Sequence, residues 1–187
     1  MSLNKGSLIS IEKFFEMRSD TEFLLEYIDG IVYMSPSSST KHQRVSSSLQ
    51  LKLGNFLESG PCEVFVAPYD IELKKDSIEG CKIVIPDLSI ICNKDGFTET
   101  RYQGVPNLIV EILSPSNQSH DLITKLNLYM KYGVSEYWIV NPMLDSITVY
   151  VLNKEGMYEQ FGVKTGKGKV TSSVLSGFAV DLESVFG

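Results

Sequence analysis

The spacing of apolar residues is helical near the N-terminus and strand-like through the middle of the chain. A short helix is predicted after Ser10, and an apolar segment over residues 23–34 contains Asp29-Gly30. An Asp-Gly pair between two apolar runs is typical of a β-hairpin, because a type I′ turn requires positive φ at both central residues. Apolar residues then recur at helical spacing over residues 39–58, which predicts an amphipathic helix.

Strand-like runs dominate from residue 62 onward. The run over 107–113 is almost continuously apolar and is bounded by Pro106 and Pro115, which indicates a strand buried on both faces. The remaining predicted elements are strands at 62–67, 69–73 (or one bent strand) and 82–92, a helix at 117–131, a strand at 136–140, a hairpin over 146–163 and a short helix within 180–186. This order indicates an α/β fold with a mixed sheet and with β-hairpins near both ends.

Composition narrows the class of protein. The chain has 187 residues, of which 43% are hydrophobic and 21% charged. These are ordinary globular values, which exclude a disordered chain, and the length predicts one domain over residues 1–187. There is no apolar run of the roughly 18 residues that a membrane span needs. The N-terminus also lacks the apolar region of a signal peptide, so we expect a cytoplasmic protein with no membrane partner.

Cysteine use and net charge add two further expectations. Cys62, Cys81 and Cys92 are odd in number and form no C-x-x-C pair. We therefore expect reduced thiols instead of disulfides or a zinc site. The net charge of −6 argues against a protein that coats nucleic acid. It is compatible with a nuclease, because carboxylates gathered around a metal ion make such a site locally acidic.

Two acidic residues interrupt apolar strands. Glu111 lies in the run over 107–113, and Asp87 follows Pro86 in the run over 82–92. A carboxylate buried in a strand is costly unless it is paired, protonated or bound to a metal. Structural ion pairs and a bend at Pro86 are the simpler explanations. If the two strands are adjacent and in register, both carboxylates face one point, and two hard oxygen ligands suit Mg²⁺ or Mn²⁺.

The helix that follows Glu111 carries a third candidate. Asn117, Asp121 and Lys125 are spaced four residues apart along one edge of its apolar stripe, so a long lysine side chain could reach the sheet. The simpler alternative is a surface ion pair between Asp121 and Lys125, worth a few tenths of a kcal/mol. The two acids on the preceding strands favour the functional interpretation.

These features together resemble the Uma2 family of the PD-(D/E)xK nuclease superfamily. The resemblance runs through most of the chain in order. The matching stretches are residues 26–30, 35–37 followed by His42, 86–89, 110–116, 121–125 and 132–140. It implies a restriction-endonuclease-like mixed β-sheet core flanked by helices. In the superfamily a lysine normally lies two residues after the acid, and here that position is Leu113. The resemblance therefore makes Lys125, on the following helix, the replacement.

The resemblance also implies a site and a reaction. Asp87, Glu111 and the backbone carbonyl of Ile112 would hold Mg²⁺ or Mn²⁺, with Lys125 as the catalytic lysine and Asp121 orienting it. The reaction would be hydrolysis of phosphodiester bonds in DNA by an endonuclease, with RNA left open, and a homodimer would suit cutting of two strands.

Two further residues are weaker candidates. His42 occupies the first core helix, where many relatives have a glutamate, and Glu26 lies on the early hairpin, where a structural role is the simpler interpretation.

Three other functions stay open at this point. The fold could bind nucleic acid without cutting it, or serve as a protein-interaction domain that has lost its chemistry. A Ser–His hydrolase using His42 or His120 is disfavoured, because the sequence has no G-x-S-x-G elbow.

Overall fold

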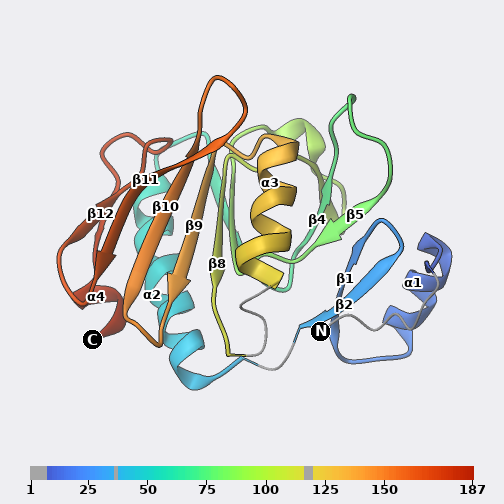
Figure 1. Ribbon diagram of the computed structural model, residues 1–187, viewed down its shortest axis with the longest axis horizontal. Coiled ribbons are helices and arrows are strands. Elements are labelled where there is room, and N and C mark those ends of the chain that lie inside the picture. The colour runs from blue at the N-terminus through green and yellow to red at the C-terminus, as the bar shows by residue number, and fades with distance from the viewer. Residues whose placement is uncertain (1–7, 36–37, 116–119) are drawn as a thin grey trace.

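The computed structural model describes residues 8–35, 38–115 and 120–187. Two mixed sheets form the framework (Figure 1). The first has five strands in the order β2-β1-β5-β4-β7, and the second has six in the order β11-β10-β9-β8-β6-β3. A small pair, β12-β13, completes the described sheets. The expected α/β class with a mixed sheet and flanking helices is confirmed, although the strands divide between sheets instead of forming one.

The N-terminal elements follow the local sequence signals. Helix α1 (Ile11–Ser19) begins after Ser10, whose Oγ accepts a hydrogen bond from the Lys13 amide at 3.3 Å. Strands β1 (Leu24–Ile28) and β2 (Ile31–Ser35) form an antiparallel hairpin. Asp29 and Gly30 take positive φ values of 47° and 89° between them, as a type I′ turn requires. The predicted hairpin is confirmed.

Two predicted strand regions each divide between the two sheets. Strands β3 (Glu63–Val66) and β4 (Asp70–Leu73) lie in different sheets, and the cis peptide bond between Ala67 and Pro68 falls between them. The run over 82–92 is likewise two strands, β5 (Lys82–Val84) and β6 (Leu88–Ile91). The single strand expected there is wrong, because Pro86 interrupts pairing. Asp87 consequently lies at the crossing point between the sheets.

The six-stranded sheet carries a helix on each face (Figure 1). Helix α2 (Thr40–Leu57) packs against the side chains of Leu108, Val110 and Ile112 from strand β8 (Leu108–Ile112). Ile109 of β8 belongs instead to the core beneath helix α3 (Leu126–Tyr132). The prediction of a strand buried on both faces is therefore confirmed, and the alternation of side chains directs Glu111 towards α3.

The remaining elements complete the second half of the chain. They are η1 (Lys94–Gly96), β7 (Arg101–Gly104), the π-helix η2 (His120–Lys125), β9 (Glu136–Asn141), β10 (Ser146–Leu152), β11 (Tyr158–Thr165), β12 (Lys169–Thr171), β13 (Ala179–Asp181) and α4 (Glu183–Phe186). The predicted C-terminal hairpin is β10–β11. Strands β7, β12 and β13 lie outside the predicted elements. No helix in the described ranges is long and apolar enough to span a bilayer.

One expectation about cysteines is wrong. Cys62 and Cys92 form a disulfide, whereas Cys81 is free. The antiparallel register of β3 and β6 pairs Glu63 with Ile91, so the two cysteines occupy the next opposed positions. They are 30 residues apart in sequence, and only the strand pairing brings them together.

The disulfide gives a prediction about stability. Because it closes a loop of 30 residues, its removal in Cys62→Ser/Cys92→Ser should lower the free energy of unfolding by about 3–4 kcal/mol. Denaturant melts of the wild type with and without reductant, beside the double variant, measure this. A wild-type midpoint that is unchanged by reductant, together with two free thiols at these positions by mass spectrometry, would contradict it.

Candidate functional site

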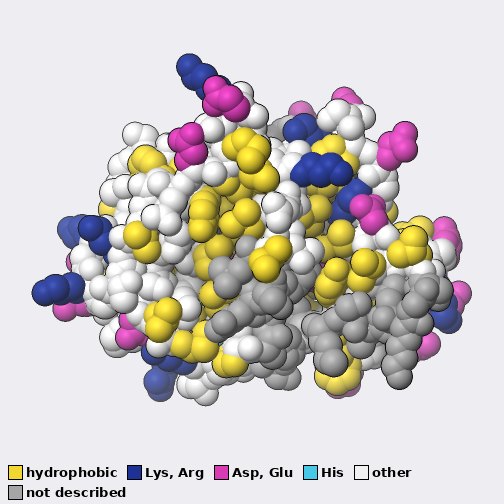
Figure 2. All heavy atoms as spheres, viewed as in Figure 1, with side chains coloured by type: hydrophobic (Ala, Val, Ile, Leu, Met, Phe, Trp, Pro, Cys, Tyr) yellow, Lys and Arg dark blue, Asp and Glu magenta, His cyan; other side chains and the backbone are white. Residues whose placement is uncertain are grey.

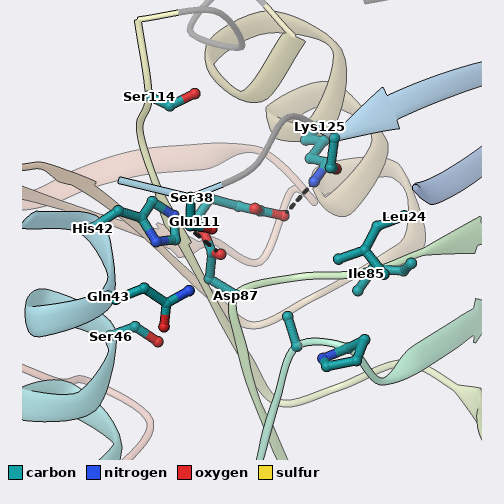
Figure 3. Close-up of a pocket in the computed structure, with 13 residues that line it drawn as sticks. Leu24, Ser38, His42, Gln43, Ser46, Ile85, Asp87, Glu111, Ser114 and Lys125 are labelled. Carbon is teal, nitrogen blue, oxygen red and sulfur yellow. Dashed lines mark hydrogen bonds and ion pairs between the residues drawn. The ribbon is translucent and has the colours of Figure 1, made fainter. Parts of the chain in front are cut away.

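A pocket of about 200 Å³ opens where the two sheets, α2 and η2 meet. Figure 3 shows Glu111 and Lys125 pointing towards one another in it, with His42, Gln43 and Ser46 projecting from α2. Asp87 belongs to the same lining. Three of the residues singled out from sequence, Asp87, Glu111 and Lys125, therefore lie around one cavity.

Asp87 is held by two neighbouring elements. The β6–β8 ladder pairs Leu88 with Val110, which places Asp87 opposite Glu111 at the end of the ladder. Its Oδ2 accepts a hydrogen bond from the Ile112 amide at 2.7 Å, and its Oδ1 lies 3.2 Å from His42 Nε2. These contacts fix the carboxylate at the end of the sheet, beside Glu111. The expectation that strands β6 and β8 are neighbours is confirmed.

Glu111 is buried, with 2% of its surface exposed. Its Oε1 accepts hydrogen bonds from the Tyr129 hydroxyl at 2.7 Å and from Lys125 Nζ at 2.9 Å. Burial raises the pKa of Tyr129 well above its usual value, and the negative charge of Glu111 raises it further. Tyr129 therefore stays protonated at neutral pH and acts as a hydrogen-bond donor that orients Glu111.

Lys125 is shared by two acids. Its Nζ lies 2.9 Å from Glu111 Oε1 and 2.9 Å from Glu26 Oε1. Glu26 comes from β1, is 1% exposed, and its Oε1 also accepts a hydrogen bond from the Ile85 amide at 2.7 Å. The structure thus brings Glu26 into contact with the catalytic candidate Lys125, a pairing that the sequence did not reveal. The signal available was an acid inside an otherwise apolar hairpin strand.

The helix that carries Lys125 differs from the one predicted. Lys125 is the last residue of η2, and regular α-helix begins at Leu126. A π-helical turn has more residues per turn than an α-helix. The α-helical rule that residues four apart share one face, on which the prediction for Lys125 is based, therefore does not apply to η2. Asn117 and the side chain of Asp121 lie outside the described part of the structure. The orienting role of Asp121 therefore stays a prediction.

His42 enters the site through Asp87. It is 7% exposed, and its Nε2 is directed at the Asp87 carboxylate. This orientation disfavours a Ser–His hydrolase, in which Nε2 would face a serine hydroxyl. The side chain of His120 lies outside the described residues.

The oxygen donors match a hard cation in chemistry. Asp87 and Glu111 come from opposed positions on adjacent strands, and Mg²⁺ commonly takes one or two carboxylates and keeps several water ligands. Within residues 8–35, 38–115 and 120–187, no group of three or more His, Cys, Asp or Glu side chains is placed to hold a metal. The donor set therefore fits Mg²⁺ or Mn²⁺ with water as further ligand, and the Ile112 carbonyl as ligand stays a prediction.

Comparisons with known proteins agree with the fold. The model of the Uma2 family, described as "Putative restriction endonuclease", matches residues 11–183. "Uncharacterized protein slr1290" of Synechocystis sp. (strain ATCC 27184 / PCC 6803 / Kazusa) is 26% identical over 175 residues, 93% of this chain and 90% of that protein. The crystal structure of "a putative nuclease belonging to DUF820" from Anabaena variabilis has a TM-score of 0.75 and 19% sequence identity, over 95% of this chain and 97% of that one. That degree of likeness shows a shared fold.

Proposed function

The chain belongs to the Uma2 family, described as "Putative restriction endonuclease", and on this premise we propose that it is a metal-dependent endonuclease that hydrolyses phosphodiester bonds in DNA. The observation that carries the proposal is the convergence of Asp87, Glu111 and Lys125 on one pocket. Two carboxylates and an amine around one pocket are the groups that metal-assisted phosphodiester hydrolysis needs.

The two acids would bind the cation. Asp87 and Glu111 would each supply a carboxylate oxygen to Mg²⁺ or Mn²⁺, with the Ile112 carbonyl as a further ligand. When bound, such an ion lowers the pKa of its water and polarises the scissile phosphate. The Ile112 amide orients Asp87, and the Tyr129 hydroxyl orients Glu111, so both carboxylates are held before any cation binds.

Lys125 would supply the positive charge that the reaction needs beside the ion. Its ammonium is 2.9 Å from Glu111, so it would lie beside a phosphate bound to the ion that Glu111 holds. There it would donate a hydrogen bond to the attacking hydroxide or to the phosphoryl oxygens as negative charge develops on them. Its burial, with 3% exposed, strengthens that interaction, because little water screens the charge.

Helix α2 is the surface on which we place the nucleic acid. Its eighteen residues include no Asp or Glu, although the chain as a whole has a net charge of −6. It carries Lys41, Arg44 and Lys52, and a groove beside it is lined by Lys41, Arg44 and Ser48. By contrast, hydrophobic side chains gather over the middle of the opposite face, around α3 (Figure 2). Further along α2, Leu51 and Phe56 are exposed, so the groove beside Lys41 and Arg44 is the part of this surface that favours contact with phosphates.

This placement predicts the effect of two substitutions. Arg44→Ala and Lys52→Ala should each weaken DNA binding, and each should reduce the slope of log affinity against log salt concentration by about 0.9, the value for one lost phosphate contact. Lys154→Ala, at the exposed turn between β10 and β11, is the matched control and should leave the slope unchanged. Filter binding or fluorescence anisotropy over a salt series measures it. Equal slopes in all four proteins would place the DNA on another surface.

A cleavage assay tests the proposal directly. The purified protein is incubated with supercoiled, linear and single-stranded DNA, and with RNA of matched sequence, in Mg²⁺, in Mn²⁺ and in EDTA. We expect at least one form of DNA to be cleaved, and we expect this cleavage to require the metal and to be abolished by EDTA. Cleavage of RNA alone would show that the substrate is RNA and not DNA. Cutting of both strands of a duplex, by a protein that sedimentation shows to be a dimer, would support a homodimeric enzyme. Inertness towards every substrate would contradict the proposal.

One observation favours a second candidate, a domain that binds nucleic acid without cutting it. Lys125 already neutralises Glu111, so the two could form a permanent ion pair in place of a metal site. In that case DNA would bind at α2 with the salt dependence described above, and neither Mg²⁺ nor Mn²⁺ would produce cleavage.

A further inference from the structure

Lys125 has a second acidic partner, Glu26, to which the proposed function assigns no role. Glu111 and Glu26 contact the same ammonium at the same distance, but they come from different sheets. We propose that Glu26 is a positioning residue, which holds Lys125 in place when Glu111 exchanges the lysine for the metal ion. This inference rests on the proposed nuclease function.

An exchange at Glu111 follows from electrostatics. Its Oε1 already receives two hydrogen bonds, one of them from a cation. A divalent ion bound to the same carboxylate would repel the Lys125 ammonium strongly in a buried site, where screening is weak. Lys125 and the ion therefore compete for Glu111, and binding of the ion lengthens the contact between Lys125 and Glu111.

Glu26 is suited to retain the lysine during that exchange. It is 1% exposed, and the Ile85 amide donates a hydrogen bond to the same Oε1 that Lys125 contacts. Its strand β1 is paired on both sides, with β2 and with β5, so its position does not depend on Glu111. Lys125 can then move away from Glu111 without leaving a buried ammonium unpaired, which would be strongly unfavourable.

The proposal predicts how Glu26 affects metal affinity. Without its charge, Lys125 would pair more strongly with Glu111 and compete better with the ion. Glu26→Gln should therefore weaken Mn²⁺ binding about tenfold, the equivalent of about 1.4 kcal/mol. Lys125→Met removes the competitor and should tighten Mn²⁺ binding, although it removes the group needed for cleavage.

A double-mutant cycle separates this mechanism from a simple loss of negative charge. Mn²⁺ affinity is measured by calorimetry for the wild type, Glu26→Gln, Lys125→Met and the double variant. If Glu26 acts through Lys125, Glu26→Gln should change the affinity by less than about threefold in the Lys125→Met background, within the usual limits of additivity. An equal loss in both backgrounds would show that Glu26 contributes only its charge, and would overturn the inference.

Glu136→Gln provides the matched control for burial. Glu136 is a fully buried carboxylate that accepts hydrogen bonds from the indole of Trp138 and from the amides of Ser173 and Val174. It belongs to β9, away from the pocket lining, and its variant should bind Mn²⁺ as the wild type does. An effect of Glu136→Gln as large as that of Glu26→Gln would also count against a specific role for Glu26.

A second measurement applies if Lys125→Met does not fold. In a crystal structure of the wild type with Mn²⁺, Lys125 Nζ should stay within hydrogen-bonding distance of Glu26 Oε1 while its distance to Glu111 increases. A lysine that follows Glu111 and leaves Glu26 would overturn the inference. The nuclease proposal and the proposal for Glu26 fail on different results. A wild type that binds no Mn²⁺ would contradict both. A wild type that binds Mn²⁺ and cleaves DNA, with the same Mn²⁺ affinity in Glu26→Gln, would contradict only the proposal for Glu26.

Discussion

Lys125→Met is expected to lower the free energy of unfolding by about 3–5 kcal/mol at neutral pH, the range for a buried ion pair that loses one partner. The substitution leaves Glu26 and Glu111, which are 1% and 2% exposed, beside one another without the cation that they share. The destabilisation should shrink as the pH is lowered through the range in which carboxylates take up protons, because a protonated carboxyl is cheaper to bury. Denaturant melts at neutral and acidic pH measure both effects.

Lys82→Met is the matched control for this substitution. Lys82 is also buried, with 2% exposed, but its partner Asp29 has about half of its side chain in solvent. Water can therefore solvate Asp29 after the lysine is lost, so the destabilisation should be smaller than for Lys125→Met, and cleavage should be retained. If Lys125→Met cost no more than Lys82→Met, the account of Lys125 as the shared counter-ion would be wrong.

Glu111→Gln is expected to reduce cleavage by at least about 10²–10³-fold, the effect of removing one electrostatic contact to a transition state. Stability should change little. The glutamine retains an oxygen that can accept hydrogen bonds from Tyr129 and Lys125, and the lysine keeps its ion pair with Glu26. Rates on the DNA form that the wild type cuts, together with a thermal melt, measure the two quantities.

Glu136→Gln should give the reverse result. It removes a charge that accepts two backbone hydrogen bonds, so the expected cost in stability is about 1–3 kcal/mol, with cleavage unchanged at temperatures where the protein is folded. The pair of variants thus separates a carboxylate used for chemistry from one used for folding. A Glu111→Gln protein that is strongly destabilised and still cleaves would assign Glu111 to folding.

The elements predicted correctly are those specified by adjacent residues. Asp29-Gly30 defines the first hairpin because only a few residue types adopt positive φ, and Ser39 marks the start of α2 because its hydroxyl caps the His42 amide. Glu111 could be singled out for the same reason, since a charge within a doubly buried strand is visible in the sequence. Its catalytic role stays a prediction.

The features that could not be predicted from the sequence are those that depend on which strands are neighbours in a sheet. Side-chain periodicity shows that a strand is buried but not which sheet it joins. The run over 82–92 therefore predicts one strand, whereas in the structure Pro86 lies between two strands of different sheets. The pairing of Cys62 with Cys92 and the contact of Glu26 with Lys125 both follow from such strand placement. The π-helical turn before Lys125 also has no local signal comparable to a proline or a glycine.

Calorimetric titration of Mn²⁺ tests the central claim, that Asp87 and Glu111 together hold the cation that the reaction needs. The account predicts that the wild type binds the ion, and that Asp87→Asn and Glu111→Gln each abolish this binding and slow DNA cleavage by at least about 10²-fold, while both variants remain folded. Undiminished Mn²⁺ binding in both variants, or DNA cleavage at the wild-type rate in them, would contradict the account.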